Sequence, residues 1–118
     1  MKILFVDDNE LNRMVMEDML EIIFSEATIE VYESAKEVLE QDIASYDIIL
    51  SDIDMPDIDG FALHDTLRDV HNFSKPIIAV TALAVSGDKE RMLMHGFNDY
   101  ISKPIDMQQL EEIVKRNI

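Results

Sequence analysis

Short apolar runs that alternate with segments of helical periodicity are the feature that most restricts the fold of this chain. Five runs have the length and composition of buried strands, at residues 2–6, 28–32, 46–53, 76–80 and 98–101. The predicted helices are residues 10–24, 34–42, 61–70, 87–95 and 107–116. Because parallel strands need crossover helices, this alternation predicts an α/β fold with a parallel sheet covered on both faces. The alternation alone leaves the order of the strands open.

Local signals mark the ends of several predicted helices. Ser34 with Glu37, and Asp106 with Gln109, have the spacing of capping signals at helix N-termini. Gly96 stands where a glycine commonly ends a helix. In the first helix, the apolar stripe predicted to face the core consists of Leu11, Met14, Val15, Met19, Ile22 and Ile23.

The amino-acid composition disfavours several classes of protein. The 118 residues, 47% of them apolar, are expected to form one domain over residues 1–118. The net charge of -15 disfavours direct binding to nucleic acid, because phosphate contacts require Lys and Arg. No apolar run is long enough to span a bilayer, no signal-peptide pattern is present, and there is no cysteine. We therefore expect a cytoplasmic protein without membrane insertion.

Polar side chains stand at the ends of four predicted strands. They are Asp7 and Asp8, Asp52, Thr81 and Lys103. The carboxyl ends of parallel strands share one edge of a sheet, so these groups should converge. Three neighbouring carboxylates repel one another and need protons or a cation, and oxygen-only ligands suit Mg²⁺. With Lys103 beside it, Asp52 has the environment of a nucleophile toward phosphorus.

Along its full length the chain resembles the receiver domains of two-component response regulators. The motifs that carry the resemblance are Asp7-Asp8, Asp52 with Met55-Pro56 and Asp59-Gly60, Thr81-Ala82, and Tyr100 with Lys103-Pro104. Asp8-Asn9, Asn12-Arg13 and Ser102-Lys103-Pro104-Ile105 are most similar to receivers of hybrid histidine kinases. The resemblance implies a flavodoxin-like fold, which is a doubly wound five-stranded parallel sheet of order 2-1-3-4-5 with five helices.

The resemblance also implies a function in phosphorelay signal transduction. Such a domain accepts a phosphoryl group from a phosphohistidine and then changes conformation for a downstream partner. The reaction depends on Mg²⁺ or Mn²⁺, and the partner is a histidine kinase or a histidine phosphotransfer domain. The domain is a phosphoacceptor that catalyses only its own phosphoryl transfer and dephosphorylation, rather than an enzyme. No output domain is expected within these residues.

The resemblance implies the following roles at the acidic cluster. Asp52 is the phosphoryl acceptor. Asp8 and Asp52 bind the metal ion directly, and the backbone carbonyl of Asp54 is a third protein ligand. Asp7 acts through a bound water molecule.

Further roles are implied for the ends of the last two strands. Lys103 pairs with the acceptor carboxylate and then with the phosphoryl group, to which Thr81 donates a hydrogen bond. Tyr100 is the aromatic switch residue, which turns inward as Thr81 moves. The Lys103–Pro104 peptide bond is expected to be cis.

Two rival functions remain open from the residues alone. Asp52-Ile53-Asp54 after an apolar strand is also typical of a haloacid-dehalogenase-type phosphatase. Those enzymes usually have longer chains, and their paired acidic metal ligands follow the nucleophile, whereas Asp7-Asp8 precede it here. A receiver-like docking module that binds no metal is the third interpretation, and the intact set of strand-end residues disfavours it.

Several other residues have simpler interpretations. Asp59 is interpreted as a turn former. Asp57 and Asp59 suggest a calcium loop, but Met55 occupies the expected first ligand position. The histidines are interpreted as isolated surface or helix-end residues, at His64, His71 and His95. Leu83 is expected to shield an aspartyl phosphate from water, while the acidic Asp54 brings a charge near the phosphoryl site.

Overall fold

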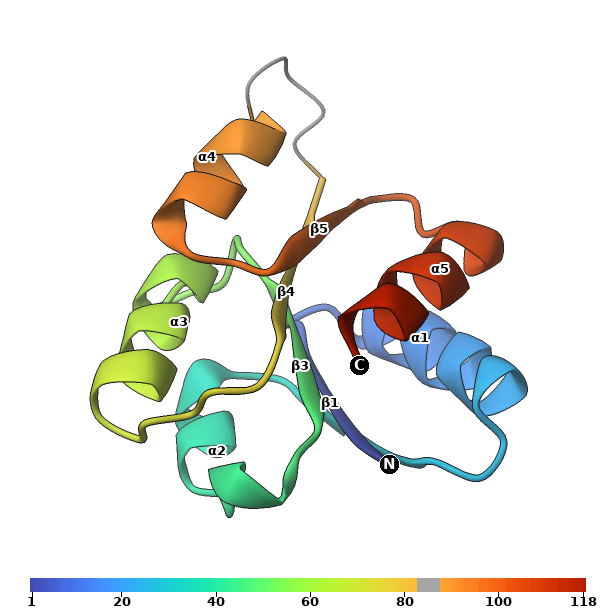
Figure 1. Ribbon diagram of the computed structural model, residues 1–118, viewed down its shortest axis with the longest axis horizontal. Helices are drawn as coiled ribbons and strands as arrows, with labels where there is room; N and C mark the ends of the chain where they lie inside the picture. The colour runs from blue at the N-terminus through green and yellow to red at the C-terminus, as the bar shows by residue number, and fades with distance from the viewer. Residues whose placement is uncertain (83–87) are drawn as a thin grey trace.

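The computed structural model describes residues 1–82 and 88–118, in which strands and helices alternate (Figure 1). The elements are β1 (Lys2–Val6), α1 (Glu10–Ile23), β2 (Thr28–Tyr32), α2 (Ala35–Leu39), the 3₁₀-helix η1 (Ile43–Ser45), β3 (Ile48–Asp52), α3 (Gly60–Asp69), β4 (Ile77–Thr81), α4 (Asp88–His95), β5 (Asp99–Ser102) and α5 (Met107–Asn117). The strands form one parallel sheet in the order β2-β1-β3-β4-β5, so the predicted fold and strand order are confirmed. Leu83 and Gly87, on which two sequence predictions rest, lie outside the described residues.

The sheet is the middle of three layers. Helices α1 and α5 cover one face, and α2, α3 and α4 cover the other (Figure 1). Alternate side chains of each strand enter opposite cores: Leu4 packs in the layer under α2, α3 and α4, and Phe5 packs in the layer under α1 and α5. Strands β3 and β4 are buried along their whole length. Burial on both faces is why these strands are continuous apolar runs in the sequence.

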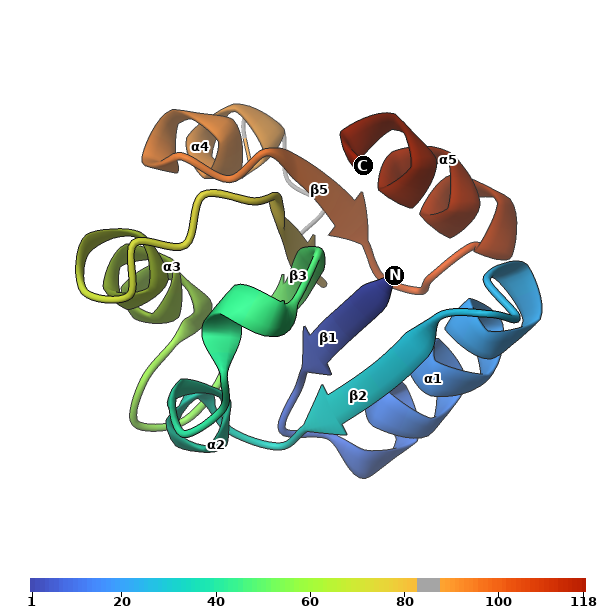
Figure 2. The same ribbon diagram turned by 60° about the horizontal axis from the view of Figure 1, so that its bottom comes forward.

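The order of the strands brings distant parts of the chain to one edge. Strand β1 lies between β2 and β3, and Figure 2 shows β1 and β2 running in the same direction. Val6 is aligned with Ser51, so Asp7 and Asp52 follow at the same level of adjacent strands. The charged residues that end these strands are therefore neighbours, although Asp7 and Asp52 are 45 positions apart in the sequence.

Side-chain oxygens cap four helices at their N-termini. The capping residues are Asn9, Ser34, Asp59 and Asp106, each of which accepts a hydrogen bond from a backbone N–H three residues later. The predicted capping signals at Ser34 and Asp106 are confirmed. Asp59 does more than form a turn, because its carboxylate accepts from Ala62 N at 2.9 Å and begins α3.

The face of α1 that meets the sheet differs from the prediction. Met16 and Leu20 are fully buried in the core. Four residues of the predicted stripe are instead exposed, at 66% for Leu11, 55% for Met14, 39% for Val15 and 68% for Ile22. Helix α1 has more apolar residues than one face can hold, and packing against the sheet and α5 selects which of them are buried.

The predicted end of α2 and the predicted start of β3 differ most from the structure. Helix α2 ends at Leu39 instead of Asp42, and η1 follows it. Backbone hydrogen bonds from Ser45 N to Asp42 O and from Tyr46 N to Ile43 O stabilise η1. Strand β3 therefore begins at Ile48, later than predicted. No helix in the described ranges has both the length and the apolar composition that crossing a membrane requires.

Replacing the cap of α3 tests the role of Asp59. We expect Asp59→Ala to lower the free energy of unfolding by about 1 kcal/mol, because the Ala62 N–H loses its acceptor. Asp59→Asn, which keeps a capping oxygen, is the matched control and should remain close to wild type in urea denaturation. Equal stability of the Ala and Asn variants would contradict the capping role.

Candidate functional site

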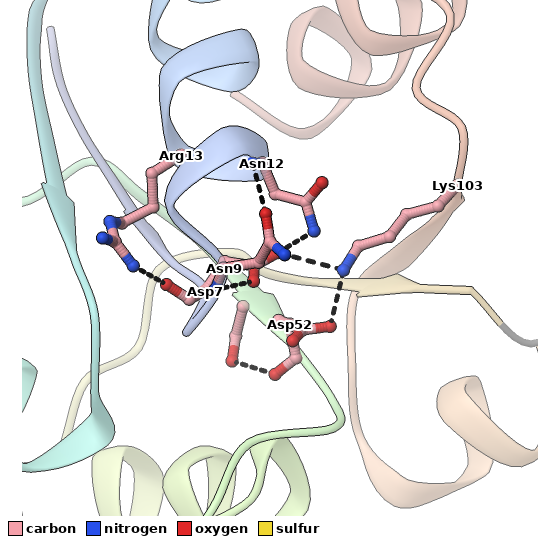
Figure 3. Close-up of polar contacts among 7 residues, drawn as sticks. Asp7, Asn9, Asn12, Arg13, Asp52 and Lys103 are labelled. Atoms are coloured by element: carbon pink, nitrogen blue, oxygen red, sulfur yellow. Dashed lines mark hydrogen bonds and ion pairs between the residues drawn. The ribbon is translucent and has the colours of Figure 1, made fainter.

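Three carboxylates and one ammonium group meet at the carboxyl ends of β1, β3 and β5. Asp7 and Asp52 are buried, with exposed fractions of 0% and 3%, while Asp8 is exposed. Oxygens of Asp7, Asp8 and Asp52 lie within 4.8 Å of one another. Lys103 Nζ donates to Asp7 Oδ2 at 2.9 Å and to Asp52 Oδ1 at 3.1 Å (Figure 3). The predicted convergence of these four side chains is therefore present in the structure.

The first turn of α1 holds Asp7 in place. Its Oδ1 accepts from the backbone N–H of Asn9 at 2.9 Å, and its Oδ2 accepts from Asn12 Nδ2 at 3.2 Å as well as from Lys103. Arg13 Nη1 donates to the backbone carbonyl of Asp7 at 2.8 Å (Figure 3). The sequence analysis assigned no contact to Asn12 or Arg13. Their position in the first turn of a helix that directly follows the strand is the signal that could have indicated one.

Burial and neighbouring charges shift the pKa values of Asp52 and Lys103. Burial, followed by the negative charge of Asp7, raises the pKa of Asp52 to about 6, and the hydrogen bond from Lys103 offsets only part of that shift. Burial also opposes the charge on Lys103, but hydrogen bonds to Asp7 and Asp52 keep the pKa of its ammonium above the usual value. Near neutral pH the Asp52 carboxylate is therefore ionised and Lys103 is protonated.

The donor set fits a divalent cation. Three carboxyl groups lie around one ammonium group, so the cluster is short of positive charge. Burial first, and then the charge of Asp7, raise the pKa of Asp52. Carboxylate oxygens in this number suit Mg²⁺, which uses few protein ligands and keeps several waters.

Thr81 and Tyr100 lie on the two strands next to this cluster. Thr81 ends β4, is fully buried, and accepts a backbone hydrogen bond from Lys103 N at 2.8 Å. Tyr100 is half-buried on β5 opposite Ala79, and packs against the core under α2, α3 and α4. The Lys103–Pro104 peptide bond is cis, as expected. Asp54 is exposed, two residues beyond Asp52.

Gly60 allows the loop after β3 to fold closely against the strand end. A Cβ atom at this position would lie 2.5 Å from the carbonyl oxygen of Asp52 and 2.8 Å from Ile53 Cα. The Gly60 N–H donates to the Ile53 carbonyl at 2.9 Å. Close approach to backbone atoms is thus the reason for a glycine here, and it places the start of α3 directly against the backbone of Asp52.

An apolar groove adjoins the charged cluster. It lies between α1 and the segment after β5 and is lined by Leu11, Asn12, Val15, Lys103, Pro104 and Ile105. Leu11 and Val15 are two of the α1 residues that the sequence analysis wrongly assigned to the core. Their exposure places apolar surface next to the ammonium group that contacts Asp52.

The interpretation of the histidines as isolated residues is wrong for two of the three. His64 is 5% exposed, and its ring lies 5.2 Å from that of His95. Both imidazoles contact Asp65, outside the acidic cluster. Spacing within one helix could not have indicated this, because His64 belongs to α3 and His95 to α4. His71 is an exposed residue, as predicted.

Comparison with known proteins identifies similar chains. The family model described as the response regulator receiver domain matches residues 3–115. The signal transduction histidine-protein kinase BarA of Escherichia coli K12 is 35% identical over 118 residues, which cover 98% of this chain and 13% of that kinase. The polar-differentiation response regulator DivK of Brucella ovis is 34% identical over 119 residues, which cover 96% of this chain and 92% of DivK.

A solved structure is similar in both fold and sequence. It is the receiver domain of sensor histidine kinase PA1611 from Pseudomonas aeruginosa PAO1, described with a magnesium ion coordinated in its active-site cleft. The TM-score is 0.81 at 32% identity, over 98% of this chain and 95% of that one. The chain thus matches a small part of some relatives, such as BarA, and nearly the whole of others, such as DivK.

The charge excess at the cluster predicts an unusual effect of neutralising Asp52. Because its folded-state pKa of about 6 exceeds the ordinary value of 3.8, Asp52 favours folding most below about pH 4 and loses that contribution as the pH rises through about 6. Without divalent cations near pH 7.5, we expect Asp52→Asn to raise the free energy of unfolding by up to about 3 kcal/mol.

The measurement is urea denaturation of both proteins across this pH range in a chelating buffer. The two curves should converge near pH 4, and added Mg²⁺ should stabilise the wild type more than the variant. Asp54→Asn, which neutralises an exposed carboxylate two residues away, is the matched control and should show no such gain. A pH-independent difference between Asp52→Asn and wild type would contradict the electrostatic cause.

Proposed function

This chain belongs to the response regulator receiver family, and from that premise we propose that Asp52 is the residue that accepts a phosphoryl group from a phosphohistidine. The chain is a receiver domain of two-component phosphorelay signalling. The observation that carries the assignment is the position of the Asp52 carboxylate, at the end of β3 between the acidic pair and the Lys103 ammonium. We propose the same function for the whole of residues 1–118 as one domain.

The proposed reaction is an in-line transfer. An oxygen of Asp52 forms a bond to phosphorus as the bond between phosphorus and the donor imidazole nitrogen breaks. Lys103 is already hydrogen-bonded to Asp52, so its charge lies where negative charge on the phosphoryl oxygens must be stabilised. Asp7 holds the other side of the ammonium and thereby orients it. The domain catalyses its own phosphorylation and dephosphorylation and has no separate substrate.

The carboxylates are also proposed to bind a metal ion. Asp8 and Asp52, with the backbone carbonyl of Asp54, would hold Mg²⁺ or Mn²⁺, and Asp7 would contact the ion through water. The ion supplies positive charge that offsets the charge of the carboxylates and the incoming phosphoryl group. Support comes from the close spacing of the three carboxylates, and from the magnesium ion described in the PA1611 receiver.

The conformational response is proposed to run through β4 and β5. Thr81 is assigned as the hydroxyl that donates to a phosphoryl oxygen on Asp52. The hydrogen bond from Lys103 N to Thr81 O links the ends of the two strands. Tyr100, half-buried on β5, is assigned as the side chain that turns inward when Thr81 moves. Phosphorylation would then shift the population of conformations on this side of the domain and so signal to a downstream partner.

The donor is proposed to be a histidine kinase or a histidine phosphotransfer domain that docks on the groove beside Lys103. Transfer requires the donor histidine to reach Asp52, and the exposed side chains of Leu11 and Val15 provide apolar surface next to that point. The charge of -15 on the chain favours a donor surface with basic residues around an apolar centre.

Loss of the acceptor tests the assignment of Asp52. We expect Asp52→Asn to abolish phosphorylation by a phosphohistidine donor and by a small acyl phosphate, because the amide is not a nucleophile toward phosphorus. Intact-protein mass spectrometry measures the label, and Asp54→Asn should still be labelled. Full labelling of Asp52→Asn at another residue would contradict the proposal. Sustained turnover of a phosphate monoester would favour the haloacid-dehalogenase-type phosphatase instead.

The docking surface is tested separately from the chemistry. We expect Leu11→Ser with Val15→Ser to slow transfer from the phosphohistidine donor by about tenfold or more, because apolar contacts at the centre of the interface are lost. Labelling by a small acyl phosphate should be unchanged in this variant. Ile22→Ser, on the same helix but outside the groove, is the matched control. An equal loss with both kinds of donor would mean that the substitutions damage the site itself.

A further inference from the structure

Two histidines and an aspartate from α3 and α4 form a cluster that shares no residue with the phosphoacceptor site. His64 and Asp65 are neighbours in α3, and His95 is the last residue of α4. Asp65 Oδ1 lies 3.1 Å from His64 Nδ1 and 2.9 Å from His95 Nε2. One ligand atom from each side chain lies within 4.8 Å of those of the other two. The cluster therefore bridges two helices through a single carboxylate.

Aromatic packing fixes both imidazole rings. The His64 ring lies 4.7 Å from the ring of Phe97, and the His95 ring meets Phe61 edge-on at 4.8 Å. Gly96 has a φ of 123°, and a Cβ atom there would lie 2.9 Å from Cε1 of His64. The glycine that ends α4 thus lets the His64 ring lie directly against the end of that helix. The ligand atoms are held close together by packing, with no ion present.

The two ring nitrogens of His64 have different partners. His64 Nε2 is buried and has no hydrogen-bond partner among the described residues. A proton on Nε2 would be a buried donor without an acceptor, and its removal from Nδ1 ends the hydrogen bond to Asp65 Oδ1, so the bond from Nδ1 to a metal ion has to outweigh both losses. The tautomer with its proton on Nε2 turns the Nδ1 lone pair toward Asp65 and His95, which is the form in which imidazole binds a metal.

We propose that His64, Asp65 and His95 bind a transition-metal cation of the Zn²⁺ class and thereby join α3 to α4. Some Zn²⁺ sites consist of two histidines and one carboxylate, and a water molecule takes the fourth coordination position. The spacings of 2.9 Å and 3.1 Å to Asp65 Oδ1 are close to the edge of about 3.3 Å expected between ligands around tetrahedral Zn²⁺.

The cluster is also accessible to an ion from solution. The side chain of Asp65 is 54% exposed and that of His95 is 29% exposed, so water can complete the coordination from outside. On binding, the ion takes the place of the hydrogen bonds between the imidazoles and Asp65. Nitrogen ligands favour Zn²⁺ over Mg²⁺, whereas the all-oxygen cluster at Asp7, Asp8 and Asp52 has the opposite preference. The two sites are therefore separable by the choice of metal.

The test is a calorimetric titration of the chain with Zn²⁺ in excess Mg²⁺, which keeps the all-oxygen cluster occupied. We expect one Zn²⁺ per chain, a rise in the thermal unfolding midpoint, and a visible absorption spectrum typical of four-coordinate Co²⁺ when Co²⁺ is used instead. His95→Gln and Asp65→Asn, both at partly exposed positions, should each weaken binding by more than about tenfold. Both should also lose the Zn²⁺-dependent rise in the unfolding midpoint.

His71→Gln is the matched control, because His71 is an exposed histidine outside the cluster. It should bind Zn²⁺ as the wild type does. Circular dichroism of the metal-free variants verifies that they are folded, and the Co²⁺ spectrum of the wild type tests the ligand set without any substitution. Absence of Zn²⁺ binding would overturn the proposal. Binding that survives both His95→Gln and Asp65→Asn, or that is lost in Asp8→Asn, would overturn it as well.

Discussion

The ammonium group of Lys103 between Asp7 and Asp52 is the interaction on which the rest of this structure depends. Two buried carboxylates on adjacent strands repel each other, and their removal from water adds a further cost. Lys103 meets both at hydrogen-bond distance and draws the end of β5 toward β1 and β3. It supplies one positive charge for two carboxyl groups, and burial first and Asp7 second raise the pKa of Asp52. The site is held together while remaining short of positive charge, which is the condition that the proposed binding of a metal ion requires.

The order of the sheet makes this interaction available. Because β1 lies between β2 and β3, the first strand carries its acidic end to the side of Asp52. Strands β3 and β4 are buried throughout, so the strand ends are positioned by a rigid apolar layer. Gly60 adds a local constraint, because only a residue without Cβ lets the following loop contact the backbone of Asp52.

Some apolar residues of helix α1 are buried in the core, and others belong to the proposed docking surface. Met16 and Leu20 anchor the helix on the sheet, while Leu11 and Val15 remain at the surface beside Lys103. The same first turn supplies Asn12 and Arg13 to the side chain and backbone of Asp7. One short helix thus connects the core, the orientation of an acidic residue and the proposed docking surface. Helices α3 and α4 lie on the opposite face of the sheet (Figure 1). There, aromatic packing brings His64 and His95 together around Asp65.

The amino-acid sequence by itself determined the features that depend on neighbouring residues. Strands β1 and β2 occur at the predicted residues, Ser34 and Asp106 cap their helices, and the polar residues stand at strand ends, because apolar runs and capping signals act over a few residues. Only the tertiary structure decided which stripe of α1 is buried, why position 60 requires glycine, and that His64 meets His95. Each of these depends on a contact between segments that are distant along the chain. The periodicity of apolar residues predicts that a helix has an apolar face. Which sheet or helix packs against that face is decided only by the tertiary structure.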